Sequence, residues 1–152
     1  MTNGFCRSRQ PVRQILSGMI TIQKQVYDSM IAHAKHDYPN EACGVLGAKE
    51  LGNGAHFFAM KNVDYSPVSY FMDPKEQLKI FKEMRELGIQ MTGIFHSHVA
   101  SVAYPSAKDV RLAFYPEVSY LIVSLSQMDK PVLRSFKIEN DLVKEEEIKI
   151  VS

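Results

Sequence analysis

The sequence predicts a single α/β domain in which helices flank a mixed, curved β-sheet. The expected elements run helix, strands, helix, strand, helix, strands along the chain, an order that suits a mixed sheet with helices packed against it. The chain has 152 residues, of which 45% are hydrophobic and 23% charged, a composition typical of one globular domain with its own core. This length excludes two catalytic domains.

The N-terminal half is predicted to contain two helices and a hairpin. Thr21 can cap a helix, because apolar residues recur at a four-residue spacing after it until Pro39 breaks the pattern. The Gly-Asn-Gly turn at 52–54 separates two apolar runs and indicates a β-hairpin. Asp73 precedes a first-turn proline, and Gly88 ends the apolar periodicity, as in a capped helix. The expected elements are a helix at 22–36, strands at 41–47 and 56–63, and a helix at 74–87.

The C-terminal half begins with a strand at 91–98 that is apolar at first and polar at its end, which is typical of a buried strand emerging at a surface. A short helix is expected at 106–115. Two further strands are expected, at 120–125 and 132–138. We interpret the acidic run at 145–147 as the solvated face of a last strand or tail.

Residues 1–18 contain three arginines and no acidic residue. An organelle transit sequence has this character, but a flexible, solvated tail is the preferred interpretation. The folded domain is therefore expected at residues 19–152.

Charge and cysteine content narrow the classes of function. Eighteen Lys+Arg against 17 Asp+Glu give a net charge of +1, which provides no overall field to attract nucleic acid or anionic lipid. Cys6 and Cys43 lack a CxxC spacing, so neither a disulfide framework nor a Cys-rich zinc module is expected. No apolar run reaches the roughly 18 residues of a membrane span, and no secretory signal is evident. We expect a cytoplasmic protein with no nucleic-acid or membrane partner.

Two histidines, His96 and His98, end the predicted strand at 91–98. Residues i and i+2 of a strand project from the same face, so both imidazoles can converge on one point. Neutral imidazole is a common zinc ligand, and a catalytic zinc site needs three protein ligands and an open position for water. Asp109 lies in the first turn of the next expected helix and can return beside the strand end as the third ligand.

Each part of this pattern also has a simpler explanation. A His-x-His pair alone is weak evidence for a metal, because histidines at strand ends are usually at the surface or hydrogen-bonded. Ser106 and Asp109 have the spacing of a helix capping arrangement. Ser97 should face away from the metal and satisfy local backbone groups. A cap and a catalytic role for Ser106 are compatible, because a hydroxyl both donates and accepts hydrogen bonds.

The complete string over 96–109 is the His-Ser-His-x7-Ser-x2-Asp signature of the JAMM (MPN+) metallopeptidases. The chain resembles this family from about residue 21 to 138, in its compact, stand-alone prokaryotic form. Glu41, which precedes an apolar run, resembles the family's upstream glutamate. The resemblance implies the JAMM/MPN fold, which is cytidine deaminase-like.

The resemblance also implies roles for five side chains. His96, His98 and Asp109 would bind one Zn²⁺ per chain together with a water molecule. Glu41 would accept a proton from that water, and Ser106 would help to stabilise the developing oxyanion. These residue types suit the chemistry, because zinc lowers the pKa of bound water toward ~7 and one oxyanion donor is typically worth ~3 kcal/mol of barrier. The expected activity is that of a zinc-dependent hydrolase.

Some stand-alone prokaryotic members of this family act on ubiquitin-like sulfur-carrier proteins. The resemblance therefore implies cleavage of a peptide or isopeptide bond after the C-terminal Gly-Gly of a ubiquitin-like or sulfur-carrier partner. A di-glycine tail can lie extended in a narrow groove and add to a sheet edge. The aromatic residues of the 63–71 loop either line such a groove or pack into the core. Val99 replaces the proline that many members carry, which affects loop geometry and removes no ligand.

Two alternatives stay open. One is a different zinc hydrolase on the same scaffold, although RadC-type relatives usually carry asparagine where this chain has Ser97. The other is a non-catalytic MPN-type scaffold domain that assembles partners. Such members commonly lack a ligand, whereas every expected position is occupied here. The oligomeric state is not predicted.

Four other residues are weaker candidates. His33 and His36 can share a helix face but have no evident third ligand, so we expect them to be exposed to solvent. His56 has no visible partner. Cys43 should share a strand face with Glu41, and a buried, inert thiol is preferred over a redox or ligand role.

Overall fold

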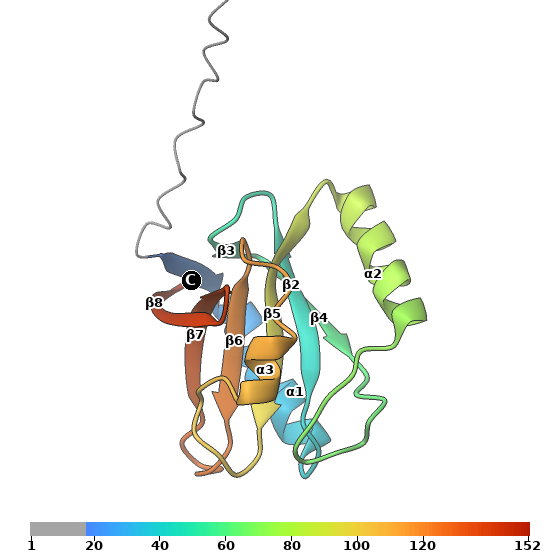
Figure 1. Cartoon of the computed structure of the whole chain (residues 1–152). Helices are drawn as coiled ribbons and strands as arrows, with labels where there is room; N and C mark the ends of the chain where they lie inside the picture. The colour runs from blue at the N-terminus through green and yellow to red at the C-terminus, as the bar shows by residue number, and fades with distance from the viewer. Residues whose placement is uncertain (1–17) are drawn as a thin grey trace, which may run out of the picture.

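The computed structural model describes residues 18–152 (Figure 1). The predicted flexible tail, residues 1–18, lies outside the described residues except for Gly18. In chain order the elements are β1 (Met19–Gln23), α1 (Lys24–Asp37), β2 (Cys43–Ala48), β3 (Asn53–Gly54), β4 (His56–Met60), α2 (Pro74–Leu87), β5 (Gln90–His98), α3 (Ala107–Arg111), β6 (Ser119–Ser124), β7 (Val132–Glu139) and β8 (Leu142–Val151).

The strands form one mixed sheet with the order β3-β1-β8-β7-β6-β5-β2-β4. The β1–β3, β1–β8 and β5–β6 pairs are parallel, and the other pairs are antiparallel. The sheet curves until its ends approach each other, because Ala55, directly after β3, donates its N–H to the carbonyl oxygen of Gly47 in β2 at 3.1 Å. The prediction of a mixed, curved sheet is confirmed.

Helices cover both faces of this sheet (Figure 1). On one face, α1 buries a row of side chains in a core shared with β1, β2, β5 and β6: Val26, Met30 and Ala34. On the other face, Ile80 and Met84 of α2 pack with Val45 of β2, and Val110 of α3 packs on β6 and β7. The end of β5 therefore lies between the start of α3 on one side and the loop before α2 on the other.

A β-bulge interrupts the pairing of β2 with β5. Leu46 and Gly47 of β2 pair with Gly93 and Met91 of β5, so Thr92 is an extra residue in β5. In a regular strand, residues an odd number of positions apart lie on opposite faces. The extra residue removes this constraint, so Met91 packs on the same side of the sheet as Ile94.

Beyond the bulge, the residues of β5 alternate between the two faces. Phe95 is buried in the core under α1, whereas Ile94 packs on the α2 and α3 side. His96 and His98 share the parity of Ile94 and therefore project on the α2 and α3 side.

The predicted start of the first helix is wrong. Thr21 lies within β1, and α1 begins after Gln23, which makes no side-chain cap. Ile20 and Ile22 are fully buried, and the β1 backbone pairs with β3 and β8. A five-residue strand shows too little alternation to be distinguished from a helix start, and its partner strands are distant in sequence.

Four other boundaries differ from the prediction. β2 begins at Cys43, so Glu41 lies before the strand, and residues 53–54 pair with β1 as β3 within the predicted turn. α3 ends at Arg111 rather than at 115, and Leu112 is its C-cap. β4 ends at Met60 rather than at 63. The other expected elements are confirmed, including the β2–β4 pairing and the Asp73 and Gly88 caps of α2.

A search of residues 18–152 finds no helix that is both long and apolar enough to cross a membrane.

Candidate metal centre

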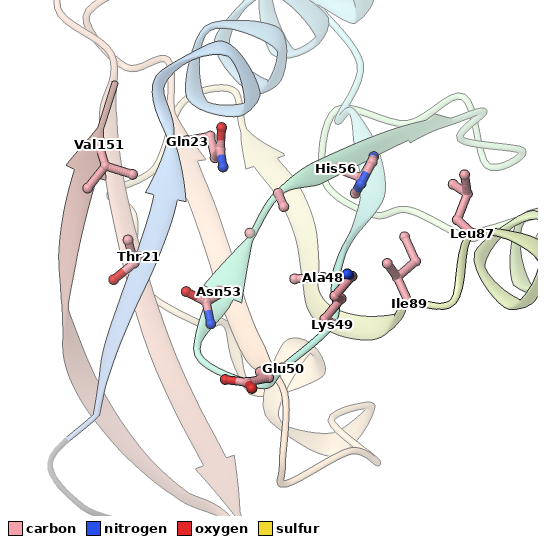
Figure 2. Close-up of a pocket in the computed structure, with 12 residues that line it drawn as sticks. Thr21, Gln23, Ala48, Lys49, Glu50, Asn53, His56, Leu87, Ile89 and Val151 are labelled. Atoms are coloured by element: carbon pink, nitrogen blue, oxygen red, sulfur yellow. The ribbon is translucent and has the colours of Figure 1, made fainter.

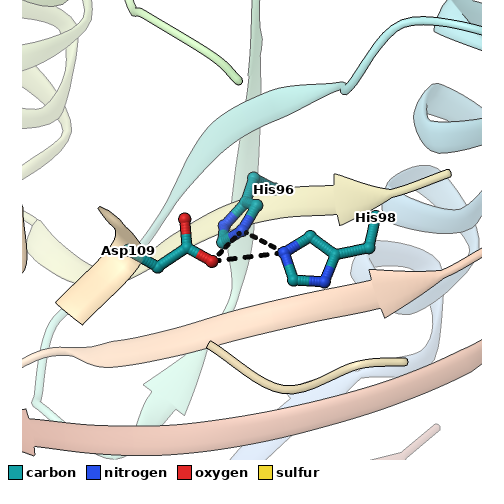
Figure 3. Close-up of side chains that lie close together, drawn as sticks. All are labelled: His96, His98 and Asp109. Carbon is teal, nitrogen blue, oxygen red and sulfur yellow. Dashed lines mark hydrogen bonds and ion pairs between the residues drawn. The ribbon is translucent and has the colours of Figure 1, made fainter. Parts of the chain in front are cut away.

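Three side chains from β5 and α3 meet at one point (Figure 3). The Nε2 atoms of His96 and His98 lie 3.0 Å apart, and Oδ2 of Asp109 lies 3.1 Å from the first and 3.2 Å from the second. Both histidines are buried and Asp109 is half-buried. The three residues predicted as metal ligands therefore come together at the end of β5, and no other such group occurs among residues 18–152.

The loop after β5 fixes the orientation of His98. The Nδ1 atom of His98 lies 2.8 Å from the carbonyl oxygen of Val102 in this loop. Because a carbonyl only accepts, Nδ1 carries a proton, so Nε2 is the nitrogen whose lone pair a bound metal would take. The loop is itself anchored, since Oγ of Ser124 in β6 donates to the carbonyl oxygen of Ser101 at 2.6 Å. Metal-binding histidines are usually oriented by such a bond on the far nitrogen.

His96 is oriented by an aromatic ring. Tyr70 stacks on it with ring centroids 4.7 Å apart and an interplanar angle of 24°. Burial lowers the pKa of His96 and outweighs the opposing effect of Asp109, so the neutral imidazole that a metal requires is favoured. Burial also raises the pKa of Tyr70 above its ordinary range, so its hydroxyl stays protonated.

Asp109 uses one oxygen both for a helix cap and for the cluster. Ser106 caps α3: its Oγ accepts the N–H of Asp109 at 3.1 Å, and its own N–H donates to Oδ2 of Asp109 at 2.8 Å. Burial raises the pKa of Asp109, but the hydrogen bonds from His96, His98 and the Ser106 backbone outweigh it and hold the pKa well below its ordinary value. The capping arrangement is confirmed, and it aims an ionised carboxylate at the histidines.

The donor set fits a zinc ion. Two imidazole nitrogens and a carboxylate oxygen crowd together, and Nδ1 of His98 holds its proton on the far side of the ring, where the Val102 carbonyl oxygen accepts it. Two tetrahedral ligands at ~2.1 Å from zinc lie ~3.4 Å apart, close to the separations of 3.0 to 3.2 Å found here. Two histidines and one carboxylate are also a ligand set of catalytic zinc sites, which keep a fourth position open.

Glu41 lies two residues before the start of β2 and is 5% exposed. Burial raises the pKa of Glu41 to about 7; among the nearby charges His98 lowers it and Asp109 raises it. Ser97 anchors this segment, since its N–H donates to the carbonyl oxygen of Ala42 at 3.0 Å and its Oγ accepts the N–H of Ala42 at 2.8 Å. Ser97 thus satisfies a backbone group, as predicted, but this group belongs to the distant Ala42 rather than to the local backbone.

Sequence reasoning missed three contributors to the site. Val102 acts through its carbonyl oxygen, so its side chain gives no signal. Tyr70 was expected in a groove or in packing, without its contact to His96. Asn62 was not singled out, although its amide binds the Glu41 carbonyl oxygen at 2.9 Å; an asparagine just after an apolar strand was the available signal.

Of the weaker candidates, His33 and Cys43 have structural roles. His33 is half-buried, with Nε2 3.0 Å from the carbonyl oxygen of Cys43 and 3.3 Å from that of Met60. The expectation that it is exposed is therefore wrong, because it ties α1 to β2 and β4. His36 is exposed, as predicted. Burial raises the pKa of Cys43 to about 12, which keeps the thiol protonated and fits the preferred interpretation of a buried, inert cysteine.

Two pockets differ in their relation to the cluster. An apolar pocket of about 200 Å³ lies between α2 and the residues after α3, and its wall includes Tyr70, which stacks on His96. The 63–71 loop therefore lines a pocket beside the cluster through Tyr70 and Phe71. A larger pocket of about 510 Å³ lies where β1 and β3 face the end of β2 (Figure 2), and none of the predicted site residues lines it.

Comparison with known proteins shows the family of this chain. The model of the family described as prokaryotic homologs of the JAB domain matches residues 23–139. The chain belongs to this family. The predicted resemblance is thereby confirmed, and the His-His-Asp cluster lies inside the JAB-domain match.

Relatives of this JAB-domain chain span most of its length. It is 37% identical over 134 residues to the CysO-cysteine peptidase of Mycobacterium tuberculosis, covering 88% of this chain and 92% of the relative. It is 33% identical over 114 residues to the desampylase of Haloferax volcanii, covering 71% and 82%. The solution structure of a protein from Desulfitobacterium hafniense matches with a TM-score of 0.81 and 48% identity, covering 88% and 94%.

Proposed function

We propose that this chain is a zinc-dependent JAMM-type peptidase. Its substrate is a peptide or isopeptide bond after the C-terminal Gly-Gly of a ubiquitin-like or sulfur-carrier protein. The observation that carries the proposal is the meeting of His96, His98 and Asp109 at the end of β5. The names of the relatives, a CysO-cysteine peptidase and a desampylase, support the same class of reaction. The domain limits of 19–152 and the cytoplasmic location stay predictions from the sequence.

His96, His98 and Asp109 would hold one zinc ion, with one position left for water. When bound, the ion would lower the pKa of a water molecule toward ~7 and polarise the scissile carbonyl. Val102 and Ser106 keep the ligand atoms of His98 and Asp109 directed at that point through their hydrogen bonds. Tyr70 holds the ring of His96 from one face.

Glu41 would act as the proton acceptor and donor. Burial raises the pKa of Glu41 to about 7, which is the range in which a carboxylate can take a proton from water and give it up again near neutral pH. The proton would pass to the leaving amine as the bond breaks. Ser97 supports this role by holding the Ala42 backbone on both sides.

Ser106 would donate a hydrogen bond to the developing oxyanion. Its Oγ accepts the N–H of Asp109 through a lone pair, which leaves the hydroxyl proton available for an acceptor in the site. A single donor of this kind typically contributes ~3 kcal/mol to transition-state stabilisation.

A protein partner suits the surface beside the cluster. Phe71, Leu112 and Phe114 line the apolar pocket and are 52%, 52% and 71% exposed. Clustered exposed apolar side chains are typical of a protein-binding surface. A Gly-Gly tail, which has no side chains, could lie extended between this surface and the metal ligands.

A decisive experiment is hydrolysis of a carrier protein joined through its C-terminal Gly-Gly to cysteine or to a lysine side chain. The purified chain should release the carrier, the chelator-treated chain should not, and added zinc should restore the rate. Mass spectrometry of the carrier identifies the bond that is cut. Binding of the carrier without cleavage would instead support the scaffold alternative, and cleavage by metal-free protein would exclude zinc chemistry.

A further inference from the structure

Asn62 is a buried polar side chain to which the proposed chemistry gives no role. It is 4% exposed and follows β4 at the base of the loop that leads to α2. An isolated bridge to Met72 closes this loop. A side-chain amide buried at such a base must have its hydrogen bonds satisfied, and the identity of its partners indicates what it organises.

The amide of Asn62 makes four hydrogen bonds, all to the main chain. Its Nδ2 donates to the carbonyl oxygens of Glu41 at 2.9 Å and Ser69 at 3.0 Å. Its Oδ1 accepts the N–H groups of Asp64 at 3.0 Å and Phe71 at 3.1 Å. Two acceptors face the nitrogen and two donors face the oxygen, so the orientation of the amide is fixed by the network.

These partners belong to two parts of the candidate centre. Glu41 is the proposed proton acceptor, and both of its main-chain groups are hydrogen-bonded. Its carbonyl oxygen accepts from Asn62 Nδ2, and its N–H donates to the carbonyl oxygen of Ser66 at 2.8 Å. Ser69 and Phe71 lie on either side of Tyr70, whose ring stacks on the ligand His96.

We propose that Asn62 is a positioning residue that sets both the Glu41 carboxyl and the Tyr70 ring relative to the metal ligands. The inference rests on the proposed function. Residues that hold a catalytic group through its backbone act on the rate of the bound complex, because small displacements of the reacting groups are costly. Asn62 does not touch the metal ligands, whose own partners are Val102 and Ser106.

The near-isosteric variant Asn62→Asp tests the role. It replaces the NH₂ donor with a carboxylate oxygen that faces the carbonyl oxygens of Glu41 and Ser69, so both anchors are lost. We expect kcat per bound zinc to fall about tenfold or more, with zinc retained at about one per chain and with KM changed much less than kcat. Asn140→Asp makes the same chemical change on the exposed turn between β7 and β8 and should leave all three quantities unchanged.

The outcomes separate the two proposals. If the wild-type chain shows no zinc-dependent cleavage, the proposed function fails whatever the variant does. If the wild type is active and Asn62→Asp keeps its kcat per bound zinc, or loses activity only in proportion to lost zinc or folded protein, the positioning role is overturned. Should Asn62→Asp not fold, Asn62→Ser, which retains a small neutral donor, is measured in the same way and judged by the same two quantities.

Discussion

Replacing Glu41 with glutamine should have two opposite effects, ending hydrolysis while stabilising the metal-free fold at neutral pH. Burial raises the pKa of Glu41 from 4.5 to about 7, so the folded chain disfavours the charged carboxylate. Below pH 4.5 the group is neutral in both the folded and the unfolded chain. As the pH rises to 7 the unfolded chain ionises first, and the free energy of unfolding falls; above pH 7 the loss is constant.

The magnitude follows from this rise in pKa. At ~1.4 kcal/mol for each pKa unit, the penalty on the charged group is at most ~3.5 kcal/mol. Solvent that still reaches the carboxyl screens part of this energy, so we expect ~1–2 kcal/mol. The amide that Glu41→Gln introduces is not charged at any of these pH values, so the substitution should remove the penalty.

Urea unfolding of chelator-treated protein at pH 4 and pH 8 measures the effect. The variant should be more stable than the wild type by ~1–2 kcal/mol at pH 8 and nearly equal to it at pH 4. Glu147→Gln, which changes an exposed glutamate on β8, is the matched control and should show no such difference. Equal stability of wild type and Glu41→Gln at both pH values would refute the reasoning about burial, and an unchanged rate of hydrolysis would exclude Glu41 as the proton acceptor.

Three further variants test the site and the sheet. Asp109→Ala should reduce zinc from about one per chain to none by elemental analysis, and full retention would contradict the ligand set. Ser106→Ala should lower kcat by ~10²–10³-fold with zinc kept; an undiminished kcat rules out the oxyanion donor. In Gly44→Ala the new Cβ would lie 2.6 Å from the carbonyl oxygen of Phe58. The free energy of unfolding in urea should therefore fall by ~1–3 kcal/mol. An unchanged urea midpoint would argue against this pairing of β2 with β4.

The metal cluster could be predicted from the sequence because its geometry is local. His96 and His98 share a strand face by simple alternation, and Asp109 sits in the first turn of a helix whose cap is visible as Ser106. α2 could be predicted equally well, since its caps, Asp73 and Gly88, act on neighbouring residues. The helix caps depend on contacts within a few residues, and the cluster joins residues at most 13 positions apart.

Features that depend on distant partners could not be predicted. β1 exists because β3 and β8 pair with its backbone, and the sequence of residues 19–23 alone fits a helix start as well. His33 is partly buried because α1 rests against the carbonyl oxygens of Cys43 and Met60. Asn62 and Val102 contribute through main-chain groups that only the folded chain brings into range.

The extra residue in β5 has a consequence for how this scaffold tolerates insertions and deletions. Met91 and His96 are separated by an odd number of positions yet serve the same side of the sheet, since Thr92 shifts the phase of the strand between them. Deleting Thr92 would leave Met91 and His96 four positions apart and on the same side of the sheet, whereas keeping Thr92 in a regular strand without the bulge would force a choice. Either Met91 would leave the core beneath α2, or His96 would turn toward α1 and away from Asp109, so the bulge that absorbs Thr92 is as much a part of the metal centre as the identity of its ligands.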